Sequence, residues 1–394
     1  MPIFNPMRPA YQQDPYPSLA SLREREPVHR STELNAWVVT SYELCDRVLH
    51  DDDTFSSDPL NASGPMGESI AATRAAVPLG TAPILGNTDD PEHARLRAIV
   101  NRAFVPRAIE SVRPAVEDIA AEVLDGIPDG PVELMSAFIE PFVVFSVLEQ
   151  LGIPSADRPA FREAARVVIA ARAEGPSRLP AARAAHGALS TLLERWQSSG
   201  EVPETTVLGT LLAAVATGEQ LTADEMLMTL IHISSAGNGP SACAIGNAVL
   251  TLGRHRDALA QLVADPALLQ PAVEETLRFD SATHLLTRFV LADTELGGRR
   301  IRKGELVYAV IGAANRDPAR FFDPDVFDIT RTDNRHLSFG IAIHFCLGAP
   351  LARIMIATAL SALIARYGHY RLIDVQRGGT LLLRGPGRLV IAAE

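Results

Sequence analysis

A single cysteine, Cys346, stands between two glycines just before an apolar helical pattern begins, and it constrains this chain more than any other feature. The glycines are Gly340 and Gly348, and a run rich in Ala and Leu follows directly. A cysteine at the beginning of a helix lies near the positive end of the helix dipole, which favours the thiolate over the thiol. The glycines leave room for a flat, bulky group to approach the backbone. One thiolate with such open space above it suits the axial ligand of a haem iron.

The run around this cysteine strengthens that interpretation, although a lone cysteine is by itself more often a small buried hydrophobic residue. The run resembles the cysteine-ligand signature of the cytochrome P450 family, Phe-Gly-x-Gly-x-His-x-Cys-x-Gly-x-x-Leu-Ala-Arg. It departs at Ala342, where the family has its second glycine, and we expect a small local adjustment without loss of iron ligation. The resemblance implies a bound haem b, with Cys346 as the iron ligand. The matching residues are Phe339, Gly340, His344, Cys346, Gly348, Leu351, Ala352 and Arg353, of which the first five bind the cofactor by this resemblance.

Two basic side chains on a second predicted helix are candidates for binding the haem carboxylates. Acidic residues around Pro91 indicate a helix start, and His93 and Arg97 then lie four residues apart on one face. Such a face could hold two carboxylates or could simply be solvated. The run Asp90–Arg97 resembles the P450 helix that binds haem propionates, which favours binding. By the same resemblance Arg288 and His344 complete the set, and buried carboxylates need such partners.

A third motif, Glu275-x-x-Arg278, places a carboxylate and a guanidinium three residues apart on a predicted helix. As a bare pattern it is common. Here it resembles the P450 Glu-x-x-Arg helix, which pairs with a later arginine to brace the cysteine loop, and Arg331 is the expected partner. A planar guanidinium bonded bidentately to a buried carboxylate fixes geometry in a way that lysine cannot.

Composition and length exclude several classes of protein. The 394 residues are 47% hydrophobic and 21% charged, which is typical of a globular chain, and no Gly/Ser- or Pro-rich linker divides it. A net charge of −11 argues against nucleic-acid binding. The longest apolar run, Phe142–Leu148, is too short to span a membrane, and the N-terminus has no signal-peptide pattern. Three scattered cysteines make a zinc site or disulfide framework unexpected. We therefore expect a cytoplasmic, monomeric protein with a single domain, 1–394.

One long helix, over residues 222–253, carries an unusual segment at its centre. Thr222 and Glu225 form a capping-box pattern, and apolar helical spacing follows. The stretch Ala236–Ser241 holds two glycines and Pro240, which predicts a bend or break. This segment resembles the family's pattern Ala-Gly-x-(Asp/Glu)-Thr. When the two are aligned on Ala236-Gly237, the family's acid falls on Gly239 and its threonine on Pro240. Both members of the acid–alcohol pair are missing.

That missing pair puts the ordinary delivery of protons for dioxygen cleavage in doubt, because acid and alcohol normally relay those protons. Only Ser241 and Asn238 remain as nearby polar groups, and they are our candidate catalytic residues besides Cys346. Three alternatives stay open. A substrate hydroxyl or an ordered water near Pro240 carries the proton, peroxide replaces dioxygen, or the enzyme performs an atypical oxidation such as phenol coupling or ring closure.

Substrate-contacting residues are expected from spacing and from the family resemblance. His232, Ala236 and Pro240 step along one helix face, so His232 either faces the pocket or is a satisfied core histidine. By resemblance Leu285 and Leu286 line the pocket. The Gly-, Ser- and Pro-rich stretch 51–87 predicts a long loop that covers it, and 372–392 predicts a hairpin whose tip touches substrate.

The resemblance spans nearly the whole chain and implies a mainly helical P450 fold with a small β portion. The haem is expected between the long helix 222–253 and the cysteine loop 336–348. The implied activity is oxidation of a small hydrophobic or amphipathic metabolite, free or tethered to a carrier, in secondary-metabolite biosynthesis. Ferredoxin and ferredoxin reductase are the expected electron donors. A haem-thiolate ligand sensor without catalytic activity is the alternative from another functional class.

Overall fold

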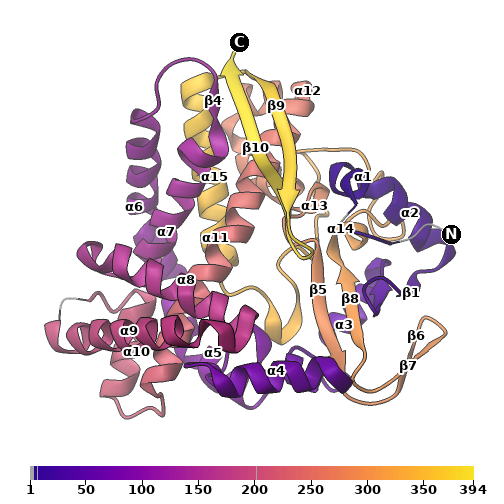
Figure 1. The fold of residues 1–394 in the computed structure, drawn as a ribbon. Coiled ribbons are helices and arrows are strands. Elements are labelled where there is room, and N and C mark those ends of the chain that lie inside the picture. Colours follow the sequence, from indigo (N-terminus) through magenta and orange to yellow (C-terminus); the bar gives the residue numbers. More distant parts are fainter. Residues whose placement is uncertain (1–3, 7, 201) are drawn as a thin grey trace. The chain divides into compact units, whose positions relative to one another are not determined.

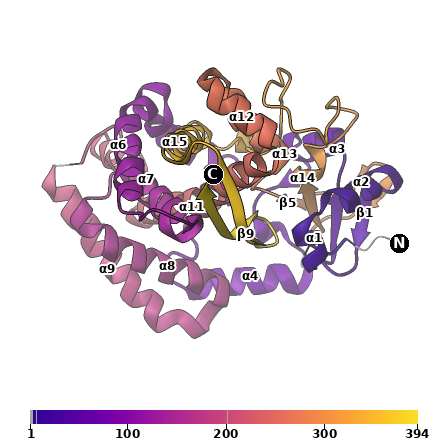
Figure 2. The same cartoon turned by 90° about the horizontal axis from the view of Figure 1, so that it is seen from above.

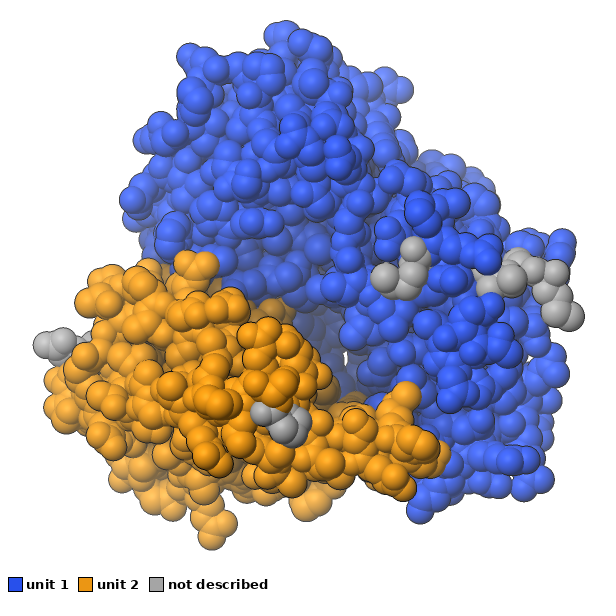
Figure 3. All heavy atoms as spheres, in the orientation of Figure 1, with its two compact units in different colours: residues 1–55, 114–145, 237–394 blue, residues 56–113, 146–236 orange. Residues whose placement is uncertain are grey.

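The chain is mainly helical with small sheets, and the computed structural model describes residues 4–6, 8–200 and 202–394 (Figure 1). It divides into two compact units, which Figure 3 colours separately. Unit 1 comprises Met1–Phe55, Pro114–Phe145 and Gly237–Glu394, and unit 2 comprises Ser56–Arg113 and Ser146–Ala236. One boundary divides the short strand β3 (Phe55–Ser56), and the other three fall inside helices α6 (Pro106–Asp125), α7 (Glu140–Leu151) and α11 (Ala223–Arg254).

Apart from the β3 residue Ser56, the regular structure of unit 2 is helical among its described residues. Besides parts of the three shared helices it contains α4 (Gly64–Ala76), α5 (Glu92–Val100), α8 (Arg158–Glu174), α9 (Leu179–Ser199) and α10 (Val207–Ala216), with the short turns η1 (Pro59–Asn61), η2 (Leu85–Asn87), η3 (Asn101–Phe104), η5 (Ser155–Asp157) and η6 (Gly175–Arg178).

Unit 1 contains the remaining helices and all the strands, except that the second residue of β3 is assigned to unit 2. Its helices are α1 (Pro9–Gln13), α2 (Tyr16–Arg25), α3 (Tyr42–His50), α12 (Arg256–Ala264), α13 (Leu269–Phe279), α14 (Ile311–Ala314) and α15 (Ala349–Tyr367), with η4 (Met135–Ile139), η7 (Pro266–Leu268) and η8 (Ala342–His344). Its strands are β1 (Val28–Ser31), β2 (Ala36–Val39), β3 (Phe55–Ser56), β4 (Val132–Glu133), β5 (Leu285–Val290), β6 (Thr294–Leu296), β7 (Arg299–Ile301), β8 (Leu306–Val310), β9 (Tyr370–Gly379) and β10 (Arg384–Ala393).

The largest sheet has the strand order β1-β2-β8-β5-β3. Its central strand β8 is buried along its whole length, and it pairs in parallel with β2 and antiparallel with β5. A continuous apolar run suits a strand covered on both faces. One hydrophobic cluster formed by this sheet includes Val39, Cys45 and Val307. The sheet matters to function because β5 carries Leu285, Leu286 and Arg288.

The stretch 51–87 is not the unstructured loop that its composition predicts. It contains a helix of 13 residues, α4, with Pro65 in its first turn. The alanines of this segment have high helix propensity, and they outweigh the glycines and serines that suggested a loop. The expectation of a long loop was therefore wrong.

Helix α11 runs without interruption for 32 residues, although Pro240 lies inside it. The predicted capping box is present, because the Thr222 hydroxyl accepts the Glu225 amide at 3.1 Å and the Glu225 carboxylate accepts the Thr222 amide at 2.7 Å. The predicted break is absent. Proline removes one backbone hydrogen bond, and that single loss does not end so long a helix, because its flanking turns remain helical.

A row of glycines lets the β9–β10 hairpin lie close along α11, and Figures 1 and 2 show the two side by side. Gly239, Gly246 and Gly253 are spaced by seven residues, about two helical turns, so they share one face. A Cβ atom at Gly246 would come within 2.6 Å of Pro386, and one at Gly253 within 2.8 Å of Leu372. Any larger residue in this row would push the hairpin away.

Helix α15 is the one helix among the described residues that has the length and composition for a membrane span, although Arg353 interrupts its apolar run. However, 56% of its most apolar window is buried inside the protein. A buried core helix is apolar for that reason, so its composition is weak evidence for a membrane span.

Candidate functional site

The cysteine loop is a tight turn that ends where α15 begins. The Cys346 amide donates to the Phe339 carbonyl at 2.8 Å, which closes the loop. Two residues within it have left-handed backbone, Gly340 at φ +66° and Ala342 at φ +57°. Glycine adopts this conformation freely, whereas alanine is strained there. The alanine at the position of the family's second glycine thus keeps a backbone that glycine would favour.

The three cysteines differ sharply in their surroundings. Cys45 is fully buried in the core and donates to the Val39 carbonyl at 3.3 Å, and burial raises its pKa far above the ordinary thiol value. Burial also raises the pKa of Cys243 to about 11. Cys346, by contrast, is exposed. Because only a thiolate binds iron, burial disfavours the first two as ligands and leaves Cys346 as the suitable one.

The residues around Cys346 in unit 1 fit a haem with a thiolate ligand. A Cβ atom at Gly348 would meet nothing within 4 Å, so the backbone beside the thiol is open to a large group. Arg288 on β5 is buried, with 5% of its surface exposed, and donates to the Thr287 carbonyl at 2.9 Å. His344 is the last residue of η8. An accessible thiol and two basic side chains are the donor set that a haem carrying carboxylates requires.

The other two predicted carboxylate-binding residues belong to unit 2 and are described with it. His93 and Arg97 both lie on α5, four residues apart, as their spacing predicts. His93 is buried, with 2% exposed, and its Nδ1 lies 3.2 Å from the Asp90 carboxylate. A buried imidazole held by an acid at the start of its helix has a fixed orientation.

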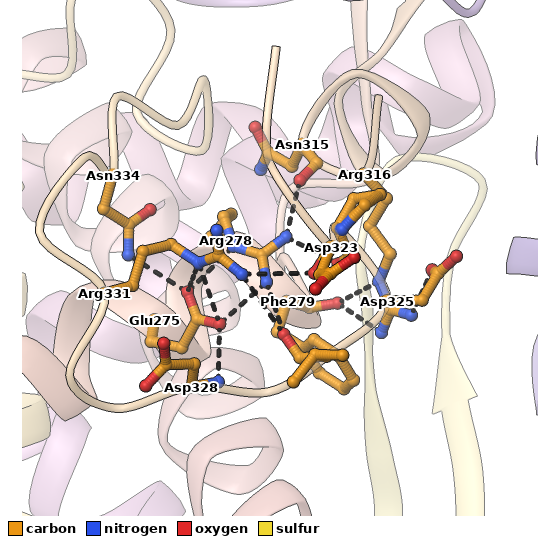
Figure 4. Close-up of polar contacts among 12 residues, drawn as sticks. Glu275, Arg278, Phe279, Asn315, Arg316, Asp323, Asp325, Asp328, Arg331 and Asn334 are labelled. Atoms are coloured by element: carbon orange, nitrogen blue, oxygen red, sulfur yellow. Dashed lines mark hydrogen bonds and ion pairs between the residues drawn. The ribbon is translucent and has the colours of Figure 1, made fainter. Parts of the chain in front are cut away.

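The predicted brace is formed in full (Figure 4). The Arg278 guanidinium makes two hydrogen bonds to Glu275, at 2.8 and 2.7 Å, and both side chains are fully buried. Arg331 Nε approaches the same carboxylate at 3.2 Å. The remaining N–H groups of Arg278 donate to the carbonyls of Asn315, Pro324 and Val326. Arg278 therefore uses all five of its donors.

A second set of contacts beside the cysteine loop was not predicted. Glu274 accepts two hydrogen bonds from Arg353, at 2.6 and 2.9 Å, and lies 3.2 Å from His336 Nε2. Burial raises the pKa of Glu274, but the bonds from Arg353 and His336 outweigh burial and bring it to about 2. Arg353 also covers the Phe339 ring, 4.6 Å from its centroid. The two adjacent glutamates were the sequence signal that could have predicted this second ion pair, because Glu274 binds Arg353 while Glu275 binds Arg278.

Ser338 and Asn315 fix the beginning of the cysteine loop to the rest of unit 1. The Ser338 hydroxyl donates to the Leu277 carbonyl at 2.7 Å and accepts from the Asn315 amide at 2.8 Å. Asn315 Oδ1 in turn accepts the Leu337 amide at 2.8 Å. Neither role was predicted from the sequence, because a single serine or asparagine carries no recognisable pattern.

The middle of α11 holds the polar groups predicted near the missing acid–alcohol pair. Asn238 Oδ1 is buried without a hydrogen-bond partner among the described residues, and Ser241 is 6% exposed. Beside them a Cβ atom at Gly239 would come within 3.2 Å of Leu383, at the hairpin tip. The predicted hairpin is therefore present, and its tip lies against the helix where Gly239 and Pro240 replace the pair.

The other predicted pocket residues are distributed over both units. In unit 1, Leu285 is almost fully buried, whereas Leu286 is half-buried and lies 3.8 Å from where a Cβ of Gly340 would stand. In unit 2, Ala236 is exposed at the end of its part of α11. Burial and the charge of Arg172 lower the pKa of His232 to about 4, so its imidazole is neutral at pH 7.

A buried charge cluster near the hairpin was also missed by sequence reasoning. Asp280, which follows α13, binds Arg377 on β9 and Arg384 on β10, the latter at 3.0 Å. Burial raises the pKa of Asp280, but the two arginines outweigh it and hold the pKa well below its usual range. The Tyr16 hydroxyl donates to the same carboxylate at 2.9 Å. The cluster ties the hairpin to α13 and to the N-terminal helices.

Comparison with known proteins decides the family. The chain is 35% identical to 6-deoxyerythronolide B hydroxylase of Saccharopolyspora erythraea, over 98% of its own length and 97% of the relative. It belongs to the cytochrome P450 family. The family model described as "Cytochrome P450" matches residues 186–370. This P450 therefore takes haem b as its cofactor and is an oxidoreductase of the monooxygenase type.

Two further P450s cover the chain almost completely. The polyketide biosynthesis cytochrome P450 PksS of Bacillus subtilis is 30% identical over 97% of this chain and 96% of its own. Its solved structure covers 100% of both chains, with a TM-score of 0.87. The structure of P450BioI in complex with an acyl carrier protein ligated to hexadec-9Z-enoic acid covers 98% of this chain and 99% of its own, at 31% identity and a TM-score of 0.84. The chain thus has the P450 fold over its whole length.

Proposed function

We propose that this P450 oxidises a small hydrophobic or amphipathic metabolite in secondary metabolism, using Cys346 as the axial ligand of haem b. The exposed Cys346 thiol at the start of α15, beside the open backbone of Gly348, is the observation that carries the proposal. The haem would lie between the cysteine loop and the unit 1 part of α11. When bound, it supplies the redox chemistry, and a thiolate ligand favours O–O cleavage.

Each chain residue then has a definite task. Cys346 would hold the iron, and Phe339, Gly340 and Gly348 would shape the surface around it. His93, Arg97, Arg288 and His344 would each bind a haem carboxylate, because buried anions need cationic or donor partners. Glu275, Arg278 and Arg331 fix the segment that leads into the loop.

The polar groups in the middle of α11 act on protons and on substrate. Asn238 Oδ1 is a buried acceptor and is suited to take a hydrogen bond from a substrate hydroxyl or from water. Ser241 is the nearby hydroxyl that can pass a proton along such a chain. We infer that substrate or water supplies the proton in place of the absent acid and alcohol at Gly239 and Pro240. His232, Ala236, Pro240, Leu285 and Leu286 are the proposed substrate contacts.

The names of the relatives support the substrate class and the partners. One is a hydroxylase of 6-deoxyerythronolide B, one belongs to bacillaene polyketide biosynthesis, and one binds a fatty acyl carrier protein. We infer that the substrate is a metabolite of comparable size, free or attached to a carrier. Electrons would come from a ferredoxin and its reductase, and the enzyme would act as a monomer in the cytoplasm.

The carbon monoxide complex of the reduced protein tests the ligand assignment. Wild type should give the absorption band of thiolate-ligated haem, and Cys346→Ser should lose it. Cys45→Ala and Cys243→Ala are the matched controls and should keep it. Retention of the band in Cys346→Ser would overturn the assignment.

Turnover measurements then separate the reaction types. A metabolite library is screened by the change in haem spin state, and compounds that bind are incubated with ferredoxin, its reductase and NAD(P)H, or with peroxide alone. Product that carries one oxygen atom from dioxygen supports the proposal. Product formed only with peroxide would replace it with a peroxide-driven reaction, and reversible binding without any product would favour a ligand sensor.

A further inference from the structure

Arg172, near the end of α8, is a half-buried cation that forms no ion pair with any described residue. Three other arginines on or next to this helix do form ion pairs, and Arg162, which forms none with a described residue, is exposed to solvent. Arg158 pairs with Glu149 at 2.6 Å, Arg166 with Glu163 at 2.5 Å and Arg178 with Glu174 at 2.8 Å. Taking a charge partly out of water without a counter-ion is costly, so the exception calls for an anion that the chain itself does not provide.

One end of the Arg172 guanidinium is fixed and the other end is available. Nη1 donates to the carbonyls of Leu79 and Gly80, at 2.5 and 3.0 Å, and lies 3.8 Å from the Met228 sulfur. These bonds use the two N–H groups of Nη1. Nε and Nη2 keep three N–H groups that make no hydrogen bond to a described residue. Those two nitrogens lie side by side and form the edge that binds carboxylate or phosphate oxygens bidentately.

The charged side chain that acts on Arg172 is itself positive. Burial, and then the charge of Arg74, lower the pKa of Arg172 to about 10, so it is still charged at pH 7. Arg74 itself is paired with Asp58 at 3.2 Å. Burial and the positive charge of Arg172 lower the pKa of His232, so its imidazole is neutral. The His232 Nε2 lies near Gly86, 3.3 Å from where a Cβ atom of that residue would stand. The nearby groups therefore leave one positive charge uncompensated.

We propose that Arg172 binds an anionic group of the substrate, a carboxylate or a phosphate, through Nε and Nη2. Met228 and His232 then contact the part of the molecule next to that group. This assignment rests on the proposed function, in which α11 borders the substrate. From Met228 the helix reaches Ala236 after eight residues, about 12 Å along its axis. The substrate accordingly carries its anion at the end that lies beside Met228 and His232.

The test is a titration of the haem-loaded protein with matched pairs of neutral and anionic probes, read by the change in haem spin state. The first pairs are straight-chain fatty acids and their methyl esters. The second are a fatty acyl thioester of phosphopantetheine and the same thioester of pantetheine, which lacks the phosphate. The variants are Arg172→Gln and, as a matched control on the same helix, Arg166→Gln, whose arginine is exposed and paired.

Wild type should bind an anionic probe about ten- to a hundredfold more tightly than its neutral partner, as expected for charge-assisted hydrogen bonds. Arg172→Gln should abolish that preference while its affinity for the neutral probe stays unchanged, and Arg166→Gln should retain the preference. Preference for the free acids identifies a carboxylate, and preference for phosphopantetheine identifies a carrier-bound substrate.

Three results would overturn the assignment. One is equal affinity for anionic and neutral probes in wild type, or no response to any anionic probe. Another is a preference that survives in Arg172→Gln. The third is loss of both affinities in that variant, which would mean that Arg172 only holds the Leu79–Gly80 turn. Failure of the proposed function is recognised separately, because the carbon monoxide spectrum then lacks the thiolate band in wild type.

Discussion

At the residue scale, the most informative position is Ala342, because it has an unfavourable conformation inside the cysteine loop. Its φ of +57° is one that alanine adopts at a cost of roughly 1–3 kcal/mol, while glycine adopts it freely. The loop keeps the shape that its neighbours impose, and Ala342 bears the strain. The sequence shows that alanine stands in the place of the family's second glycine and predicts a small local adjustment of the loop. It does not predict that the adjustment takes the form of backbone strain at Ala342.

Replacing Ala342 by glycine should therefore stabilise the haem-loaded protein. Relief of strain exceeds the added entropy of the unfolded chain, so we expect a gain of about 1 kcal/mol in the free energy of unfolding. Denaturant unfolding followed at the haem absorption band measures it. Ala365→Gly, in the exposed part of helix α15, should instead cost about 1 kcal/mol. A loss of stability in both variants would show that Ala342 is not strained.

Arg278 gives a second prediction at this scale. Lysine keeps the charge but offers three donors in place of the five that Arg278 uses, and it cannot form the paired bonds to Glu275. Arg278→Lys should leave buried acceptors unsatisfied and yield protein without haem. The measurement is the ratio of haem to protein after purification. Arg320→Lys, at a partly exposed pair with Asp333, should keep normal haem content. Normal loading of Arg278→Lys would contradict the bracing role.

At the element scale, the glycine row of α11 determines how closely the β9–β10 hairpin packs. A methyl group at Gly246 would lie 2.6 Å from the Pro386 ring and 3.1 Å from the Met135 sulfur. Gly246→Ala should thus cost about 1–3 kcal/mol through overpacking. Gly187→Ala, in exposed α9 where a Cβ meets nothing within 4 Å, should gain up to about 1 kcal/mol. The melting temperatures of both variants test this prediction. Equal changes in melting temperature would show that close packing of the hairpin at Gly246 is not the cause.

Elements differ in how well their sequence predicts them. Helix α11 follows from a capping box and helical spacing, and the terminal hairpin from the stretch 372–392, because each signal is local. Helix α4 could not be predicted in this way, because the glycine and serine residues around its start made the segment look like a loop and concealed the helix propensity of its alanines. The hairpin's packing on α11 is equally hidden, because three glycines seven residues apart acquire meaning only when a partner from the far end of the chain lies on them.

The same limit applies to the candidate site. Cys346, Glu275 and Arg278 belong to a recognisable motif, and their contacts could be anticipated. Glu274, Asn315 and Asp280 could not, because their partners are 22 to 264 residues away in sequence and no short pattern joins them. Arg172 was missed for a related reason, since its importance lies in the absence of an acid beside it.

At the scale of the whole molecule, acid should destabilise the protein partly through His284. Burial, and then the charge of Arg384, lower the pKa of His284 to about 3 from an ordinary 6.5. Its Nε2 lies 2.8 Å from the Tyr11 hydroxyl, and its buried Nδ1 has no partner among the described residues. A second proton there would have no acceptor.

The direction of the pH dependence follows from that pKa. Between pH 6.5 and 3 the unfolded chain binds a proton at His284 that the folded protein does not, so stability falls as the pH is lowered through this window. Denaturant unfolding at several pH values measures the slope. His284→Gln should make the fall shallower over that range. Identical slopes in the variant and wild type would show that another group causes it.

The glycine row along α11 has a consequence for how such an enzyme could acquire new substrates. The hairpin is fastened to the helix from Leu372 to Leu383, and its tip is further tied down because the Leu382 carbonyl accepts the His284 amide at 2.8 Å. A β-ribbon anchored along its length behaves as a fixed template and does not close like a clamp. If the tip contacts substrate, selectivity can be altered by exchanging residues 380–382 alone. Such an enzyme could therefore evolve new selectivity through substitutions in this short segment, while the rest of the fold stays unchanged.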